Sequence, residues 1–94
     1  MVIGAVEVRL KVHGARSLKE KRKALKSIKD RISRMNISIA EIDDYDKWQA
    51  TTLGLVMVSN DATYITSLTD RIIEYLAGEN GIEIINSTRE ILHV

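Results

Sequence analysis

The sequence predicts an α+β sandwich in which a four-stranded antiparallel sheet carries two helices on one face. Four stretches show the two-residue alternation or the β-branched composition of strands, and two longer stretches repeat apolar residues at helical spacing. These stretches follow one another in the order βαββαβ, which is the split βαβ arrangement of the ferredoxin-like fold. Because parallel crossovers are right-handed, both helices are expected on the same face of the sheet.

Length and composition indicate one ordinary globular domain, residues 1–94. The chain is 45% hydrophobic and 29% charged, within the usual range of folded proteins. It has no cysteine, which excludes disulfides, thiolate metal sites and a cysteine nucleophile. No apolar run approaches the roughly 20 residues that span a bilayer, and Met1 leads directly into a strand pattern. We therefore expect a cytoplasmic protein without membrane contact.

The first strand and the first helix have the clearest patterns. Val2 to Val12 alternates between an apolar and a mixed face, which predicts a half-buried strand. Gly14 then supplies a turn. Ser17 and Glu20 have the spacing of a capping box, so the helix is expected to begin after Ser17 and to run to Met35.

Two strands joined by an acidic loop are expected next. The β-branched run Ile37 to Ile42 predicts the second strand, and Gln49 to Val58 predicts the third. The third strand carries apolar side chains on both faces, which is typical of a central position in the sheet. Between them lies the acidic stretch Asp43 to Lys47.

The C-terminal part predicts a helix and a last strand. Ala62 to Gly78 repeats apolar residues at helical spacing, preceded by Asp61 as a cap and stopped by the glycine. Ile82 to Asn86 predicts the fourth strand. The segment Arg89 to Val94 either extends this strand past a bulge or forms a short tail.

The first helix is amphipathic with a strongly cationic outer face. At 100° per residue its apolar side chains share one arc, and six cations fall on the opposite side, interrupted only by Asp30: Lys19, Arg22, Lys23, Lys26, Lys29 and Arg34. Charge is also segregated along the chain, because residues 9 to 34 sum to +9 whereas residues 35 to 94 sum to −7. Such segregation is informative about partners rather than about fold.

This cationic face predicts a polyanionic partner. Lysines three and four residues apart on a helix can contact successive phosphates and release counterions. Arg16, just before the helix, can join the six helical cations in a nucleic-acid site. The alternative interpretation is a solvated face that keeps a small protein soluble, or one neutralised by acidic loops of a neighbouring subunit.

Several separated motifs resemble the YlxP-like family of small bacterial proteins of unknown function. They are Ser17 to Arg22 followed by Leu25 to Ser27, then Ala40 to Asp43, Asp46 to Gln49 and Leu53 to Asp61. The resemblance implies the ferredoxin-like fold. It also implies an association with translation or ribosome assembly, because genes of this family often sit among translation genes. It brings no catalytic or binding residues that can be carried over to this sequence.

The predicted central strands lack the aromatics on which RNA-recognition sheets stack bases. Val2 to Val12 and Gln49 to Val58 contain no Phe, Tyr or Trp. We therefore expect any RNA to be recognised through its backbone and shape by the first helix.

Two features near the start of the first helix have competing interpretations. Lys21 falls within the apolar arc, so its stem is expected to cover the edge of the core while its ammonium reaches solvent. The loop from His13 to Arg16 lies where acylphosphatases bind phosphate, but it has one glycine where a cradle needs several backbone amides. His13 has no carboxylate close in sequence, which favours a surface histidine over a base.

The remaining candidates concern metals and interfaces. Asp43, Asp44 and Asp46 lack the glycine and distal glutamate of a calcium loop, so a solvated loop without metal is favoured. Trp48 is interpreted as a core plug or, alternatively, as an interface anchor. An apolar patch on the uncovered sheet face predicts a homodimer or partner contact, unless the C-terminal tail or long side chains cover it; its expected residues are Ile3, Ala5, Leu53, Leu55 and Met57.

Together these observations predict a non-enzymatic module that binds structured RNA or a ribosomal particle, with no catalytic residue and no cofactor. Two alternatives remain open. One is a small-molecule regulatory or dimerisation domain, and the other is a phosphate-handling enzyme similar to acylphosphatases.

Overall fold

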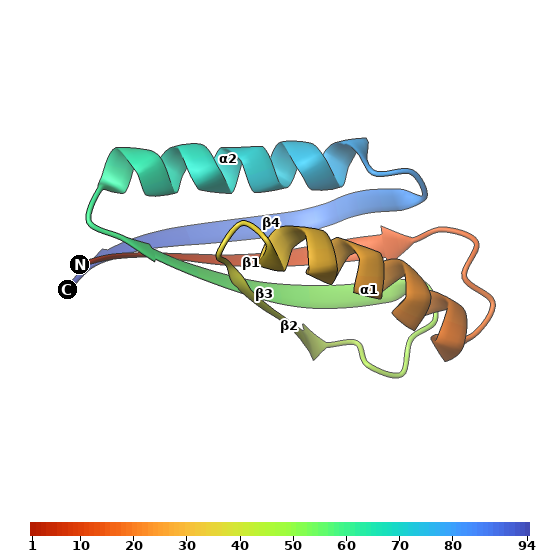
Figure 1. Ribbon diagram of the computed structural model, residues 1–94. Helices are drawn as coiled ribbons and strands as arrows, with labels where there is room; N and C mark the ends of the chain where they lie inside the picture. Colours follow the sequence, from red (N-terminus) through yellow and green to blue (C-terminus); the bar gives the residue numbers. More distant parts are fainter.

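The computed structural model describes all residues 1–94 and confirms the ferredoxin-like βαββαβ sandwich (Figure 1). The two helices cover one face of a four-stranded antiparallel sheet with the strand order β2-β3-β1-β4. The elements are β1 (Val2–Val12), α1 (Leu18–Ser33), β2 (Ser38–Asp43), β3 (Ala50–Ser59), α2 (Ala62–Gly78) and β4 (Ile82–His93). No helix has both the length and the apolar character needed to cross a membrane.

Both helices begin at the cap residues that the sequence indicates. The Ser17 hydroxyl accepts a hydrogen bond from the backbone N–H of Glu20, 3.1 Å away. The Glu20 carboxylate in turn accepts from the backbone N–H of Arg16 rather than from that of Ser17, so the capping box closes one residue early. At α2, the Asp61 carboxylate accepts from the N–H of Thr63 at 2.9 Å.

The core lies between the sheet and the two helices. From α1 it receives Leu25, Ile28 and Ile32, and α2 contributes its own apolar stripe: Ile65, Leu68, Ile72 and Leu76. The helix α2 packs closely on β1 at Gly4, where a Cβ atom would come within 2.7 Å of the Ile65 Cγ2 atom. The helices also meet at their edges, because the Arg31 guanidinium lies over the Tyr75 ring at 4.9 Å.

The orientation of β3 corrects one sequence prediction. Leu53, Leu55 and Met57 are at most 2% exposed and pack in the core beneath the helices, so they cannot form an interface on the uncovered face. Both faces of β3 are apolar in sequence, so only the pairing register determines which face is buried under the helices. Leu55 pairs with Val6, whose side chain is on the core face of β1.

The uncovered face keeps apolar side chains of its own. Ile3 and Ala5 lie there as expected, half-buried, and pair with Val58 and Val56 of β3. The large apolar side chains exposed on this face are Ile42, Val56, Val58, Ile85 and Leu92. A homodimer contact through the sheet stays a prediction, and these are the residues that would form it.

The last strand is more than twice as long as the segment Ile82 to Asn86 predicted for it. β4 runs from Ile82 to His93 along β1, and its pairing shifts at Ile85, which has no partner opposite it. The alternative in which Arg89 to Val94 extends the strand past a bulge is therefore the correct one. The two chain ends meet at this end of the sheet, where the Val94 N–H donates to the Met1 carbonyl at 2.9 Å (Figure 1).

Candidate nucleic-acid interface

The seven predicted cations lie along α1 and at its two ends. Arg16 precedes the helix, Arg34 caps its C-terminus, and both are exposed. Four of the five within the helix are exposed and Lys29 is half-buried: Lys19, Arg22, Lys23, Lys26 and Lys29. Of these seven cations, only Lys26 forms an ion pair within the molecule: its Nζ atom lies 3.8 Å from the Asp30 carboxylate.

The position of α1 determines where this cationic surface points. α2 lies over β1 and β4, whereas α1 contacts β2 (Figure 1). Arg31, which contacts Tyr75, marks the side of α1 that faces α2. At 100° per residue, Arg22 and Lys29 fall on the opposite flank and Lys26 lies beyond them toward solvent. The cationic surface therefore extends from the top of α1 toward the β2 edge of the sheet.

Lys21 is buried, and the prediction that its ammonium reaches solvent is wrong. Its side chain is 1% exposed, and Nζ lies 3.0 Å from the Glu41 carboxylate. It donates to the carbonyl oxygens of Asp44 at 2.8 Å and Ala50 at 3.1 Å, and a third contact reaches the carbonyl of Tyr45 at 3.3 Å. The acceptors come from the β2–β3 loop and from the strand residues that flank it, Glu41 of β2 and Ala50 of β3, and a helical wheel cannot reveal them.

Asp44 is likewise a structural residue rather than part of a solvated loop. Its carboxylate is 10% exposed and lies 3.0 Å from Lys47 Nζ and 3.4 Å from Arg9 Nε. It also accepts from the Thr52 hydroxyl at 2.7 Å. The hydrogen bond from Thr52, followed by the interactions with Lys47 and Arg9, lowers the pKa of Asp44 below its ordinary value, although burial opposes this shift.

The other two acidic residues of this loop, Asp43 and Asp46, are exposed as expected. No group of three His, Asp or Glu side chains in the chain is arranged to hold a metal ion.

The loop presents two aromatic side chains to solvent. Trp48 is 55% exposed and Tyr45 is 59% exposed, so the interpretation of Trp48 as a core plug is wrong. The next residue, Gln49, donates from its side-chain amide to the Ala15 carbonyl at 3.0 Å. This bond fastens the Trp48 region to the segment that leads into α1.

His13 has a carboxylate partner that its sequence neighbourhood does not contain. Its Nε2 atom lies 2.7 Å from Glu83 Oε1, and both side chains are about half exposed. The backbone N–H of His13 also donates to the Gly81 carbonyl at 2.8 Å. The partner stands 70 residues away in sequence, and the antiparallel pairing of β1 with β4 brings the two together.

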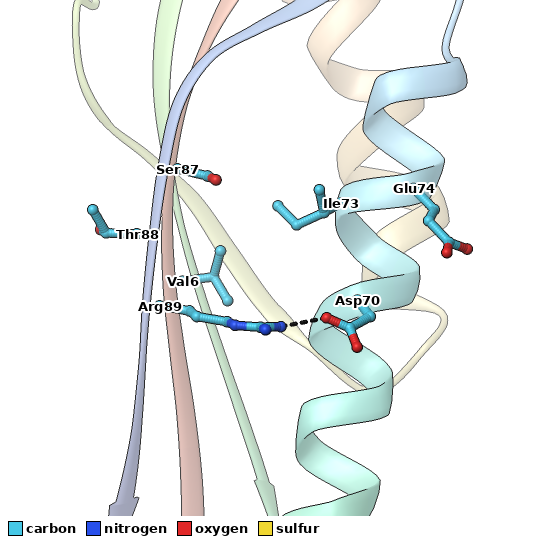
Figure 2. Close-up of a pocket in the computed structure, with 7 residues that line it drawn as sticks. All are labelled: Val6, Asp70, Ile73, Glu74, Ser87, Thr88 and Arg89. Atoms are coloured by element: carbon cyan, nitrogen blue, oxygen red, sulfur yellow. Dashed lines mark hydrogen bonds and ion pairs between the residues drawn. The ribbon is translucent and has the colours of Figure 1, made fainter.

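Two hollows in the surface were not foreseen. The first, about 450 Å³, lies between α2 and β4 and is crossed by the ion pair of Arg89 with Asp70 (Figure 2). Ser87 points toward α2 there, whereas Thr88 points away to the other side of the sheet. The second, about 420 Å³, lies on the uncovered face and has three cations in its lining: Arg9, Lys11 and Lys47.

The fold and the site define a small ferredoxin-like domain whose first helix presents a cationic surface with a single internal ion pair. The chain belongs to the family described as "Protein of unknown function (DUF503)", which matches residues 3–89. It is 36% identical over 76 residues to the uncharacterized protein YlxP of Bacillus subtilis (strain 168), covering 80% of this chain and 83% of that protein. The resemblance to the YlxP-like family is thereby confirmed.

Solved structures resemble the chain in fold. The de novo designed protein Foldit4 has a TM-score of 0.57 at 14% identity, and the match covers 98% of both chains. A designed protein with ferredoxin fold, LFR1 1, has a TM-score of 0.49 at 19% identity, with 98% of this chain and 84% of that chain covered. The likeness to Foldit4 concerns the fold alone.

Proposed function

We propose that this protein is a non-enzymatic cytoplasmic module that binds structured RNA, or a ribosomal particle through its RNA, with the cationic face of α1. The observation that carries the proposal is the set of seven cations on one helix and its ends, of which only Lys26 forms an ion pair within the molecule, at 3.8 Å. A surface made for solubility would mix both signs of charge.

The geometry of α1 suits a phosphate backbone. Lys19, Lys23 and Lys26 follow at spacings of four and three residues, so their Cα atoms stand about 4.5 to 6 Å apart along the helix axis. Structured RNA presents phosphates and 2′-hydroxyls across a wide, shallow minor groove. A straight helix with cations along its outer face can follow such a surface without reading the bases.

The second helix provides an internal comparison. Its exposed residues include Asp70 and Glu74, so the cationic character belongs to α1 and is not a general property of the helical layer. This contrast supports a specific role for α1. It also favours an orientation in which α1 faces the RNA and α2 is turned away from it, because like charges repel.

The test is a charge reversal on α1. In the variant carrying Lys19→Glu, Lys23→Glu and Lys26→Glu, we expect the affinity for a hairpin RNA to be lost. The wild-type affinity should fall with salt with a log-log slope of about −0.7 to −0.9 per neutralised phosphate. Because these side chains are exposed, thermal unfolding should be nearly unchanged.

A single substitution in each helix gives a matched control. Lys23→Glu and Arg71→Glu make the same charge change on exposed helical residues, the first on α1 and the second on α2. Only Lys23→Glu should weaken RNA binding and reduce the salt slope. Equal effects of the two substitutions would show that net charge, and not the α1 surface, governs binding. Normal RNA binding by the triple variant would refute the proposed site.

A further inference from the structure

We propose that the interface also holds one unpaired nucleotide of the RNA, with its base stacked on Trp48 and its phosphate bound by the cations of the neighbouring hollow. This inference rests on the proposed function and adds a second, base-contacting part to it. It replaces the expectation from sequence that recognition is confined to backbone and shape.

Trp48 is exposed on a loop that is held in place at several points. The buried ammonium of Lys21 donates to the carbonyls of Asp44 and Ala50, one on either side of Trp48 in the chain. Gln49 is bonded to Ala15, and Asp44 ties the loop to β3 through Thr52. A stacking surface fixed in this way loses little conformational freedom when a base binds.

The hollow on the uncovered face adjoins this loop. Lys47 and Gln49, the residues before and after Trp48, both line it, together with Lys11 and Ile85. Its volume of about 420 Å³ lies in the range of small-ligand sites. The apolar side of the hollow, at Ile85, suits a sugar or a base, and the cations suit a phosphate.

The charge of the hollow is not neutralised from within. Arg9 and Lys47 share one carboxylate, that of Asp44, and Lys11 is exposed without an ion pair. The lining of the hollow holds three cations and no carboxylate, and Glu83, which pairs with Lys11 across the strands, is bonded to His13. This excess of positive charge favours an anionic group such as a phosphate as the occupant.

The Trp48 loop is attached to the segment that leads into α1. Arg16 follows Ala15, whose carbonyl accepts the hydrogen bond from Gln49, so one of the seven cations stands next to the point of attachment. Cationic grooves with an exposed aromatic are the usual site for unpaired nucleotides, since every base has a face that can stack. An RNA backbone on α1 would thus deliver an unpaired nucleotide to Trp48.

The fluorescence of Trp48 tests the inference directly, because it is the protein's single tryptophan. Two probes are compared, a hairpin RNA with one bulged uridine and the same hairpin without the bulge. We expect both to bind in a salt-dependent manner and only the bulged hairpin to quench the fluorescence. The bulged hairpin should also bind more tightly.

Substitutions measure how much Trp48 contributes. Trp48→Leu should weaken binding of the bulged hairpin about tenfold or more, because that is the contribution of stacking one base on an aromatic side chain. Binding of the bulge-free hairpin should be unaffected. Trp48→Phe should restore part of the loss, and Lys11→Glu should act in the same direction as Trp48→Leu. Tyr64→Leu is the matched control, because Tyr64 is 48% exposed on α2 and lies outside the proposed surface.

The outcomes separate this inference from the proposed function. RNA binding with unchanged fluorescence and an inert Trp48→Leu variant would overturn the nucleotide site and leave the helix proposal standing. Absence of RNA binding at any salt concentration would overturn both. A photocrosslinking amino acid in place of Trp48 that joins to a ribosomal protein, and not to RNA, would likewise overturn the nucleotide site.

Discussion

Lys21 is the residue on which the geometry of the candidate interface depends most. Its ammonium connects α1 to carbonyl oxygens of the β2–β3 loop and to the Glu41 carboxylate, which also accepts from the Thr51 hydroxyl at 2.7 Å. A lysine that is 1% exposed is stable only if its charge is paired and its protons are bonded. Both conditions are met here, so the loop with Trp48 is positioned by a buried charge.

Removal of that charge should destabilise the fold strongly. Lys21→Met keeps most of the unbranched apolar stem but leaves Glu41 and the backbone carbonyls without their donor, which should lower the free energy of unfolding by about 3 to 5 kcal/mol. Urea denaturation measures the loss. Lys23→Met on the exposed side of the same helix should change stability by no more than about 0.5 kcal/mol.

A double-mutant cycle isolates the ion pair. Glu41→Gln removes the partner's charge and keeps an acceptor for Thr51. We expect the double variant to lose less stability than the sum of the two single losses, because the uncompensated charge is gone. Strict additivity would show that Lys21 and Glu41 do not interact in solution.

At the scale of elements, close packing fixes the position of α2 over β1. Gly4 stands where the two elements approach most closely, next to Ile65 and Met57. Gly4→Ala would place a methyl group 2.7 Å from the Ile65 Cγ2 atom, so something must shift. The expected cost is that of an overpacked core, about 1 to 3 kcal/mol by thermal or urea unfolding.

A second glycine gives the matched control. Gly78 ends α2, and a Cβ there would meet nothing within 4 Å. Gly78→Ala should therefore leave stability unchanged or raise it by up to about 1 kcal/mol, since alanine loses less backbone freedom on folding. A Gly4→Ala variant as stable as Gly78→Ala would show that α2 can move away from the sheet at little cost.

Element order and helix starts follow from the sequence because their causes are local. Alternation, helical periodicity and the caps at Ser17 and Asp61 depend on residues a few positions apart. Which face of β3 is buried does not follow from local sequence, because both faces are apolar. The pairing of Leu55 with Val6 determines which face points into the core. The bulge at Ile85 is of the same kind, since only the register along β1 reveals it.

In the candidate site, too, the features with local causes could be predicted and those with long-range causes could not. The seven cations could be assigned to one surface from helical spacing alone. Three features depend on how the β2–β3 loop folds: the burial of Lys21, the exposure of Trp48 and the hollow lined by Lys11. The hydrogen bonds that hold this loop join residues 23 to 34 positions apart in the chain. The sequence signal that could have pointed to them is a lysine inside an apolar arc followed by a loop rich in acceptors.

For the molecule as a whole, Asp44 connects the sheet to the loop that carries Trp48. Its carboxylate links Arg9 of β1, Thr52 of β3 and Lys47 of the loop. These groups form one end of the molecule, where the loop lies near the start of α1 (Figure 1). The stability of the fold and the placement of Trp48 therefore depend on the same ionised carboxyl group.

This dependence predicts how stability responds to acid. The pKa of Asp44 is lowered in the folded protein from its ordinary value of 3.8, so the folded state binds a proton less readily than the unfolded chain does. The stabilisation is fully present above the unfolded pKa and is lost as the pH falls through the folded pKa. Unfolding free energies measured by urea from neutral pH downward should therefore decrease below about pH 5.

Asp44→Asn identifies the group responsible. Asparagine tolerates the left-handed backbone at this position, where φ is 64°, so the substitution removes the charge without adding backbone strain. The variant should be less stable than the wild type at neutral pH, and the difference should shrink in acid as the wild-type carboxyl becomes protonated. Asp46→Asn makes the same change at an exposed residue of the same loop and should follow the wild-type curve. If Asp44→Asn and the wild type gave parallel curves down to strongly acid pH, the carboxyl of Asp44 would not be the link between these parts of the fold.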